Sequence, residues 1–169
     1  HIYSILLSVT MLLTACTEAV DNAVEVNKLP AIFPDYCGVT IPANIAPMNF
    51  NVTDNVDKVD VTVKGSKEGM IHHQGDYADF DIDEWHDLVG RNKGGVLIFS
   101  VCTKKDGRWY RYKDFTMEVS QYEMTDYGLT YRRIAPGYEV YSKMGLYERR
   151  IDNFDERPLI ENTQVPGMC

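Results

Sequence analysis

Four cysteines carry the most reactive side chains in this chain: Cys16, Cys37, Cys102 and Cys169. Cys37 and Cys102 fall in segments with strand character. In an exported protein, two such cysteines form either a disulfide or a pair of buried free thiols, and the sequence fits both alternatives. Cys37 beside a histidine would make a nucleophile pair, but no catalytic motif surrounds it. We therefore expect no cysteine-based catalysis.

A group of histidines and aspartates has the residue types that bind metal ions. The group consists of His72, His73, His86, Asp76, Asp79, Asp81 and Asp83. The run from Asp79 starts like a calcium loop, but it lacks the required glycine in its middle and ends at Gly90 where that loop needs glutamate. Apolar Phe80 and Ile82 favour a strand edge that leads into a helix cap. The spacing does not predict a metal site, and no phosphate loop or Gly-x-Ser-x-Gly motif occurs.

The start of the chain has the pattern of a sorting signal. An apolar run from Ile2 to Leu13 is followed by the small residues Thr14 and Ala15 and then by Cys16. The run is shorter than the about 20 residues that span a bilayer, and it has the length of a signal-peptide core. Residues 13–16 resemble the lipobox of bacterial lipoproteins. We expect residues 1–16 to be a lipoprotein signal peptide and Cys16 to be acylated; the alternative is a buried strand or helix with an incidental cysteine.

The flanks of this signal give two further expectations. Residue 1 is histidine and no lysine or arginine precedes Lys28, so the positively charged start of a signal peptide is missing. We therefore expect the chain to be truncated there. Residues 17–28 are small and acidic without clear periodicity, which is typical of a tether between a lipid and a folded domain.

The composition indicates a folded acidic protein. Hydrophobic residues make up 44% of the chain and charged residues 25%, which argues against disorder. The formal net charge is −8, and no basic cluster offers the positive surface that nucleic acid requires. We exclude nucleic-acid binding.

Strand patterns dominate from residue 29 onward. The prolines of residues 30–47 exclude a helix and leave only short edge strands. Alternation predicts a strand over 59–65, and short strands are expected at 70–73 and 77–80. The single helix is predicted to begin at Asp81 or Asp83 as its cap. Its buried face is expected to hold Trp85, Leu88 and Val89.

A hairpin is predicted over residues 95–120, because Asp106-Gly107 is a type I′ turn signal between two strands of about ten residues. In the second strand one face is expected to hold Trp109, Phe115, Met117 and Val119. The other face is expected to hold Tyr110, Tyr112, Thr116 and Glu118.

After Gln121 the sequence changes to short tyrosine-rich strands, and residues 146–162 have the pattern of strand, polar turn and strand. We therefore expect two units. The first is a β-sandwich-like domain over residues 29–121. The second is the start of another β domain over residues 122–169, which stops before it is complete.

Two stretches resemble a family of lipoproteins from the Bacteroides group: PDYCGVTIPANIAPMNF (residues 34–50) and residues 128–169. The resemblance implies a mainly β protein, in which an antiparallel β-sandwich-like domain with one short helix leads into the opening strands of a TolB-like β-propeller. In that family a stretch like residues 165–167 is followed by Cys-x-x-Cys-His. The resemblance thus implies that Cys169 is the first cysteine of a truncated c-type haem motif; the alternative is a true terminus with an unpaired thiol.

Together these features predict a lipid-anchored binding or scaffolding protein of the cell envelope, without catalysis in this chain. Its expected partners are the membrane, through the lipid anchor, and an unidentified protein or glycan. Its expected place is the outer membrane, on the periplasmic or the surface face. One alternative is an envelope redox protein with haem c attached from Cys169 onward. A weaker alternative is a hydrolase whose catalytic residues lie beyond the chain.

Overall fold

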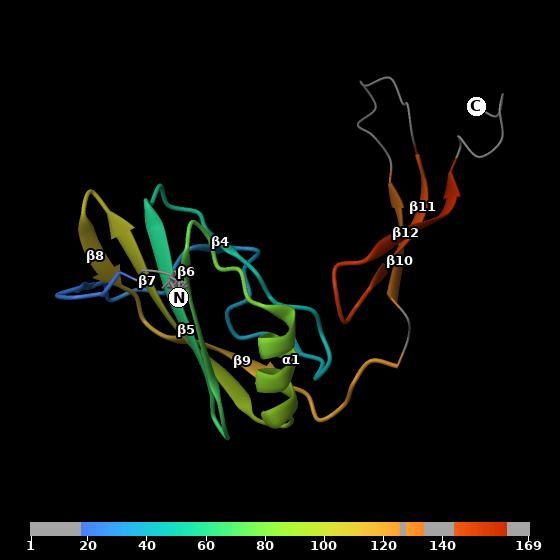
Figure 1. The fold of residues 1–169 in the computed structure, drawn as a ribbon, viewed down its shortest axis with the longest axis horizontal. Coiled ribbons are helices and arrows are strands. Elements are labelled where there is room, and N and C mark those ends of the chain that lie inside the picture. Colours follow the sequence, from blue (N-terminus) through green and yellow to red (C-terminus); the bar gives the residue numbers. More distant parts are fainter. Residues whose placement is uncertain (1–17, 126–127, 134–143, 162–169) are drawn as a thin grey trace, which may run out of the picture.

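The computed structural model describes residues 18–125, 128–133 and 144–161, which are mainly β with one helix (Figure 1). They form a seven-stranded sheet, called the main sheet, a three-stranded sheet and a two-stranded ribbon. The elements are β1 (Val24–Glu25), β2 (Ile32–Phe33), β3 (Thr40–Ile41), β4 (Asn51–Val52), β5 (Lys58–Gly65), β6 (Met70–Gly75), α1 (Ile82–Arg91), β7 (Val96–Lys105), β8 (Arg108–Arg111), β9 (Phe115–Val119), β10 (Gly128–Arg133), β11 (Gly145–Arg150) and β12 (Glu156–Glu161). The mainly β, sandwich-like fold is confirmed, and the propeller stays a prediction.

Strand β7 is the centre of the main sheet. It pairs antiparallel with β5 on one side; on the other side its second half pairs with β8 and its first half with β9. Strand β6 extends the sheet beyond β5, while β1 and β3 add in parallel to β8 and β9. The proline-rich segment, residues 30–47, contributes only the two-residue strands β2 and β3, as the prolines predict, and the two-residue β4 follows it.

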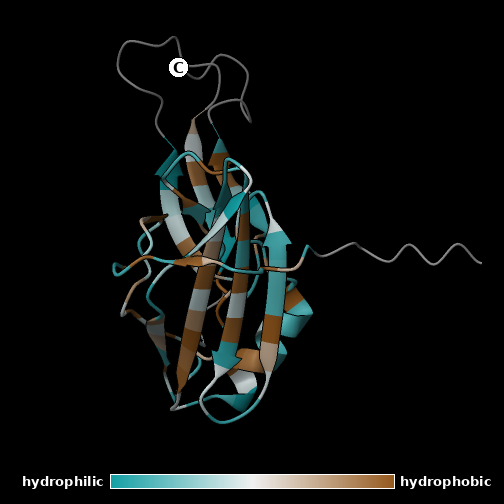
Figure 2. Ribbon diagram, turned by 90° about the vertical axis from the view of Figure 1, so that its left-hand side faces the viewer, coloured by the Kyte–Doolittle hydropathy of each residue, from teal (hydrophilic) through white to brown (hydrophobic). Residues whose placement is uncertain are grey.

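One face of the main sheet, called the core face, carries the hydrophobic core. Its strand residues are Val59, Val61, Val63, Leu97, Phe99, Val101, Phe115, Met117 and Val119. Helix α1 and the proline-rich segment cover this face, and Figure 2 shows apolar and polar residues alternating along the long strands. The rings of Phe99 and Phe115 stack with their centroids 4.7 Å apart. Each buried side chain of this size contributes about 1.5–3 kcal/mol to folding.

Helix α1 begins after Asp81. The sequence allowed either Asp81 or Asp83 as the cap, and Asp81 is the cap in the structure. The Asp81 carboxylate accepts hydrogen bonds from the backbone N–H groups of Asp83 (2.9 Å) and Glu84 (3.0 Å). Such a cap stabilises a helix by about 1 kcal/mol. The three residues predicted for the buried face are buried: Trp85, Leu88 and Val89. The short strand predicted over 77–80 does not form; only an isolated bridge joins Ala78 to Phe50.

The turn of the predicted hairpin is type I′, because both Asp106 (φ 50°) and Gly107 (φ 75°) have positive φ angles. The prediction of one continuous strand after the turn is wrong. The chain breaks at residues 112–114 into β8 and β9, which pair with different halves of β7.

This break also corrects the predicted faces of the second strand. Lys104 pairs with Trp109, whereas Phe99 pairs with Phe115, so one extra residue lies between β8 and β9. A shift of one residue turns a side chain to the opposite face of a sheet. Trp109 therefore lies on the outer face, under Lys104 (5.8 Å from Nζ to the ring centroid), and not beside Phe115. For the same reason Tyr110 and Tyr112 do not share a face with Thr116 and Glu118.

Part of the segment predicted as a tether belongs to the folded domain. Strand β1 pairs with β8, and Glu18 lies on the outer face of the main sheet. The Gln74 side-chain amide donates to the Glu18 carbonyl (2.8 Å) and accepts from its N–H (2.8 Å). The Glu18 carboxylate pairs with Lys104, and this hydrogen bond lowers the pKa of the carboxyl. The prediction failed because polar side chains and a two-residue strand hold the segment, and neither leaves a periodic apolar pattern.

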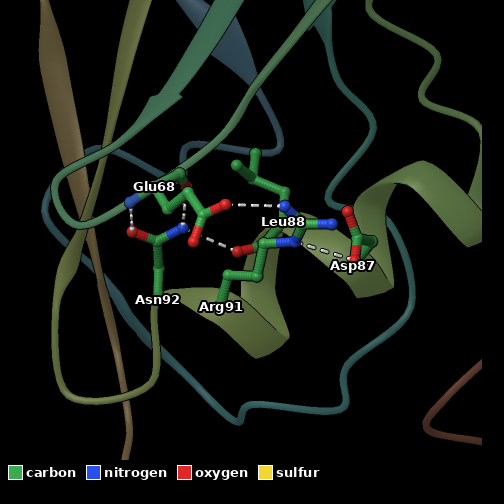
Figure 3. A network of polar contacts seen from close by, with 5 residues as sticks. All are labelled: Glu68, Asp87, Leu88, Arg91 and Asn92. Carbon is green, nitrogen blue, oxygen red and sulfur yellow. Dashed lines mark hydrogen bonds and ion pairs between the residues drawn. The ribbon is translucent and has the colours of Figure 1, made fainter.

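A buried asparagine joins α1 to the turn between β5 and β6 (Figure 3). The Asn92 side-chain oxygen accepts from the backbone N–H groups of Lys67 (2.9 Å) and Glu68 (3.3 Å). Its amide nitrogen donates to the carbonyls of Glu68 (2.6 Å) and Leu88 (2.7 Å). One side chain therefore fixes the distance between the helix end and the turn.

The strands β10, β11 and β12 form a separate antiparallel meander. The predicted strand, turn and strand are confirmed here as β11, the turn and β12. Among the described residues of this unit, the buried apolar ones are Tyr147 and Ile151. The break between the two units lies between Val119 and Gly128. No helix in the described part of the chain is long and apolar enough to cross a membrane.

Candidate functional site

A cleft of about 370 Å³ lies where the proline-rich segment meets the three-stranded sheet. Its walls are mostly apolar, and its size falls within the range of about 300–1,000 Å³ that small-molecule sites occupy. The residues that line it are Tyr36, Ile45, Ala46, Pro47, Met48, Met124, Leu129, Arg149, Arg150, Ile151, Asn153 and Phe154. Boundaries between two units of a protein are a common place for such sites.

The floor of the cleft is fixed by buried contacts. The indole Nε1 of Trp85 on α1 donates to the Ile45 carbonyl (3.1 Å). The next residue, Ala46, donates its N–H to the carbonyl of Ile151, which directly follows β11 (2.7 Å). The helix, the proline-rich segment and the three-stranded sheet are thus linked through two consecutive residues.

The linker that leads to the second sheet is fixed in the same way. The Asn44 side-chain amide donates to the Met124 carbonyl (2.9 Å) and accepts from the Met124 N–H (2.9 Å). This pair places Met124 at the rim of the cleft. Because both partners of Asn44 are backbone groups, the position does not depend on the rotamer of Met124.

Two neighbouring arginines differ in their charge partners. Arg150 binds Asp152 through two hydrogen bonds (2.7 and 2.5 Å), and this pairing lowers the pKa of the Asp152 carboxyl. Arg149 lies over the ring of Phe154 (5.2 Å to the centroid), and no described carboxylate pairs with it. Arg149 is therefore the cation of the cleft that a ligand can neutralise.

Tyr36 supplies a polar group to the lining of the cleft. Burial raises the pKa of its phenol, and the nearby Arg149 offsets part of this shift. The phenol therefore stays neutral and keeps its O–H as a donor. An apolar cleft that holds the Arg149 guanidinium, without a carboxylate partner in the described ranges, and the Tyr36 phenol suits an organic anion with an apolar body.

The structure separates the two cysteines that the sequence allowed to form a disulfide. Cys37 and Cys102 are both free thiols. Cys37 packs against the core, whereas Cys102 pairs with Asp60 on the outer face, so the main sheet lies between them. Burial raises the pKa of each thiol to about 11. Both are therefore protonated and weakly nucleophilic at neutral pH.

The histidines that resembled metal ligands lie apart. His72 Nε2 is 2.8 Å from a carboxylate oxygen of Asp60 on the outer face. His73 packs edge-on against Phe80, with the ring centroids 6.3 Å apart, and His86 lies on α1. Within the described ranges, no group of three or more His, Cys, Asp or Glu side chains is arranged to hold a metal ion.

Cys16 and Cys169 lie outside the described residues, so the predicted lipid anchor and haem motif stay predictions. The sequence did not reveal the cleft, because its residues come from three distant segments and belong to no motif. Tyr36 and Arg149 were visible only as members of a strand-rich pattern. Comparisons with protein-family models, curated proteins and solved structures find no match for this chain.

Proposed function

We propose that this chain is a lipid-anchored binding protein of the cell envelope, whose ligand site is the cleft beside Arg149. The observation that carries the proposal is the Arg149 guanidinium in an apolar cleft, which pairs with no carboxylate among the described residues. The ligand class that fits is an organic anion with an aromatic or aliphatic body. A carboxylate or sulfonate would bind Arg149 while the body of the ligand displaces water from the apolar walls.

The position of the N-terminal segment supports the orientation that an anchor would impose. Glu18 lies on the outer face of the main sheet, two residues after the predicted anchor Cys16. Ile45 at the cleft packs on the core face, beside α1. The sheet therefore separates Glu18 from Ile45, and in an acylated chain the cleft would lie on the side that faces away from Glu18.

The propeller part of the proposal rests on the second sheet. Strands β10, β11 and β12 form an antiparallel meander, as the strands of a propeller blade do. The haem alternative depends on Cys169, which lies outside the described residues. We assign no described residue to haem binding.

Binding of two related dyes tests the cleft. Anilinonaphthalene sulfonate has an apolar body with an anionic group, and N-phenylnaphthylamine has a similar body without charge. We expect Arg149→Met to weaken binding of the sulfonate about tenfold, since a charge-assisted hydrogen bond contributes about 1.5 kcal/mol. The same variant should leave binding of the neutral dye nearly unchanged. Fluorescence titration measures both affinities.

Arg132→Met is the matched control, because Arg132 is an exposed arginine on the opposite face of the same sheet. Equal loss of sulfonate binding in both variants would show a general effect of net charge. Equal loss of both dyes in Arg149→Met would show that the side chain shapes the cleft without binding the anion. Either result would reject the proposed ligand class.

The anchor is tested separately. The full chain is expressed in a lipoprotein-processing bacterium with a methionine and two lysines added before His1, which give the apolar run a positively charged flank. We expect the chain to enter the detergent phase and to gain the mass of a lipid, and Cys16→Ala to do neither. A wild-type chain that stays in the aqueous phase would refute the anchor while leaving the cleft untouched.

A further inference from the structure

Strand β6 is an edge strand of the main sheet and carries an open edge. One side of β6 pairs with β5 over six residues, and no described strand pairs with its other side. An unpaired edge exposes a row of N–H and C=O groups that can bind another extended chain.

The hydrogen-bonding pattern fixes which backbone groups face outward. The Gly65 N–H donates to the Gly69 carbonyl (3.0 Å), so these residues form a hydrogen-bonded pair. Such pairs alternate along an antiparallel ladder. Ile71 and His73 therefore direct their backbone groups toward β5, and Met70 and His72 direct theirs to the open edge.

A groove of about 380 Å³ runs between this edge and α1. Its lining residues are Gly69, Met70, Ile71, His72, Glu84, Asp87, Leu88 and Arg91. The groove thus combines an unpaired strand edge with a helix wall, which is the arrangement in which a peptide adds as a further strand.

The charges beside the groove are mostly negative. Arg91 is already paired with Asp87 (2.9 Å) and with Glu68 (2.9 Å), as Figure 3 shows. The Glu84 carboxylate has no partner among the described residues. The lining holds two carboxylates, Glu84 and Asp87, against the Arg91 guanidinium, and Glu68 from the neighbouring turn also pairs with Arg91. The groove is therefore negative and favours lysine or arginine in the added strand.

We propose that β6 binds an extended peptide with basic side chains, which adds to the main sheet through the backbone groups of Met70 and His72. A second copy of the chain would fit the edge less well. Pairing two β6 strands would place the carboxylates of both copies along one shared edge, and like charges repel there. This site goes beyond the proposed cleft and does not depend on it.

The test uses the isotope-labelled full chain and an eight-residue peptide of alternating lysine and valine. The same peptide with glutamate in place of lysine is the control. We expect the lysine peptide to shift the amide resonances of Met70–His73 and to slow hydrogen exchange of the His72 amide at least tenfold. The glutamate peptide should do neither.

Two pairs of variants locate the contact. His72→Pro removes the outward N–H, and His72→Ala removes the same side chain but keeps the N–H; proline is tolerated at an edge. We expect His72→Pro to bind the lysine peptide at least tenfold more weakly than His72→Ala. Glu84→Gln should weaken binding about two- to fivefold, while Asp83→Asn, on the same helix outside the groove, should not.

Several results would overturn the proposal. Equal binding by His72→Pro and His72→Ala would exclude strand addition. Resonance shifts confined to other strands would place the peptide elsewhere. A dimer seen in sedimentation without peptide, and lost in His72→Pro, would assign the edge to a second copy. If His72→Pro does not fold, the second pair of variants still tests the proposal. Equal affinity of Glu84→Gln and Asp83→Asn for the lysine peptide would show that the groove does not select basic side chains.

Discussion

Replacing Asn92 with alanine tests how the helix is attached to the main sheet. Asn92 is fully buried, and its side chain makes four hydrogen bonds, all to backbone groups. Two bonds reach the turn between β5 and β6 through N–H groups, and two reach carbonyls of the turn and of α1. Alanine would leave all four backbone groups without this partner.

The expected cost follows from these contacts. A neutral hydrogen bond contributes about 1 kcal/mol net, and a buried group left without a partner costs about 1–3 kcal/mol. Water can reach part of the turn from the groove beside β6, which reduces the penalty. We expect Asn92→Ala to lower the free energy of unfolding by about 3 kcal/mol and the melting temperature by about 6–12 °C.

Urea unfolding followed by circular dichroism measures this loss. Asn55→Ala is the matched control, because Asn55 is exposed and its change should stay within about 0.5 kcal/mol. A loss below about 1 kcal/mol in Asn92→Ala would refute the reasoning. It would mean that water replaces the asparagine bonds and that the network does not hold the turn.

Three other properties of the chain give predictions. A Cβ at Gly65 would lie 2.2 Å from Asn92 Nδ2 and 2.4 Å from the Glu68 carbonyl, so Gly65→Ala should cost about 2 kcal/mol in the same urea assay; an unchanged midpoint would contradict this packing. Because burial raises the pKa of Cys37 and Cys102 to about 11, alkylation of both thiols, read by peptide mass spectrometry, should be slow near neutral pH and accelerate as the pH approaches that value. Rapid alkylation at neutral pH in the folded chain would show that the thiols are not buried. Arg150 lowers the pKa of the Asp152 carboxyl. The Asp152 carboxylate therefore stabilises the turn at pH values above its ordinary pKa of 3.8, and this effect is lost as the pH falls through the lowered pKa. In Arg150→Met the pKa of Asp152, followed by carboxyl NMR, should rise toward 3.8; no change would rule out the pairing.

Local patterns predicted most of the first unit. Three features could be predicted from the sequence alone: the aspartate cap, the apolar face of α1 and the type I′ turn. Each depends only on residues that are a few positions apart in the chain. The buried face of β5 follows from strict alternation of valine with polar residues. These features need no information about distant contacts.

The features that failed depend on distant partners. The shift between β8 and β9 exists because β7 pairs with both strands in two registers, and the sequence of residues 108–119 alternates as if it were continuous. The N-terminal segment is held by Gln74 and Lys104, far along the chain. The cleft brings together residues that are about 100 positions apart in the chain. No local sequence pattern marks such residues as neighbours.

Mapping the bound sulfonate dye on the isotope-labelled chain tests the central claim most directly. If the cleft beside Arg149 is the ligand site, the amide resonances of Ile45, Ala46, Leu129 and Ile151 should shift together during the titration, and those of β8 should not. Shifts spread evenly over exposed apolar residues, or centred away from Arg149, would contradict the proposed function.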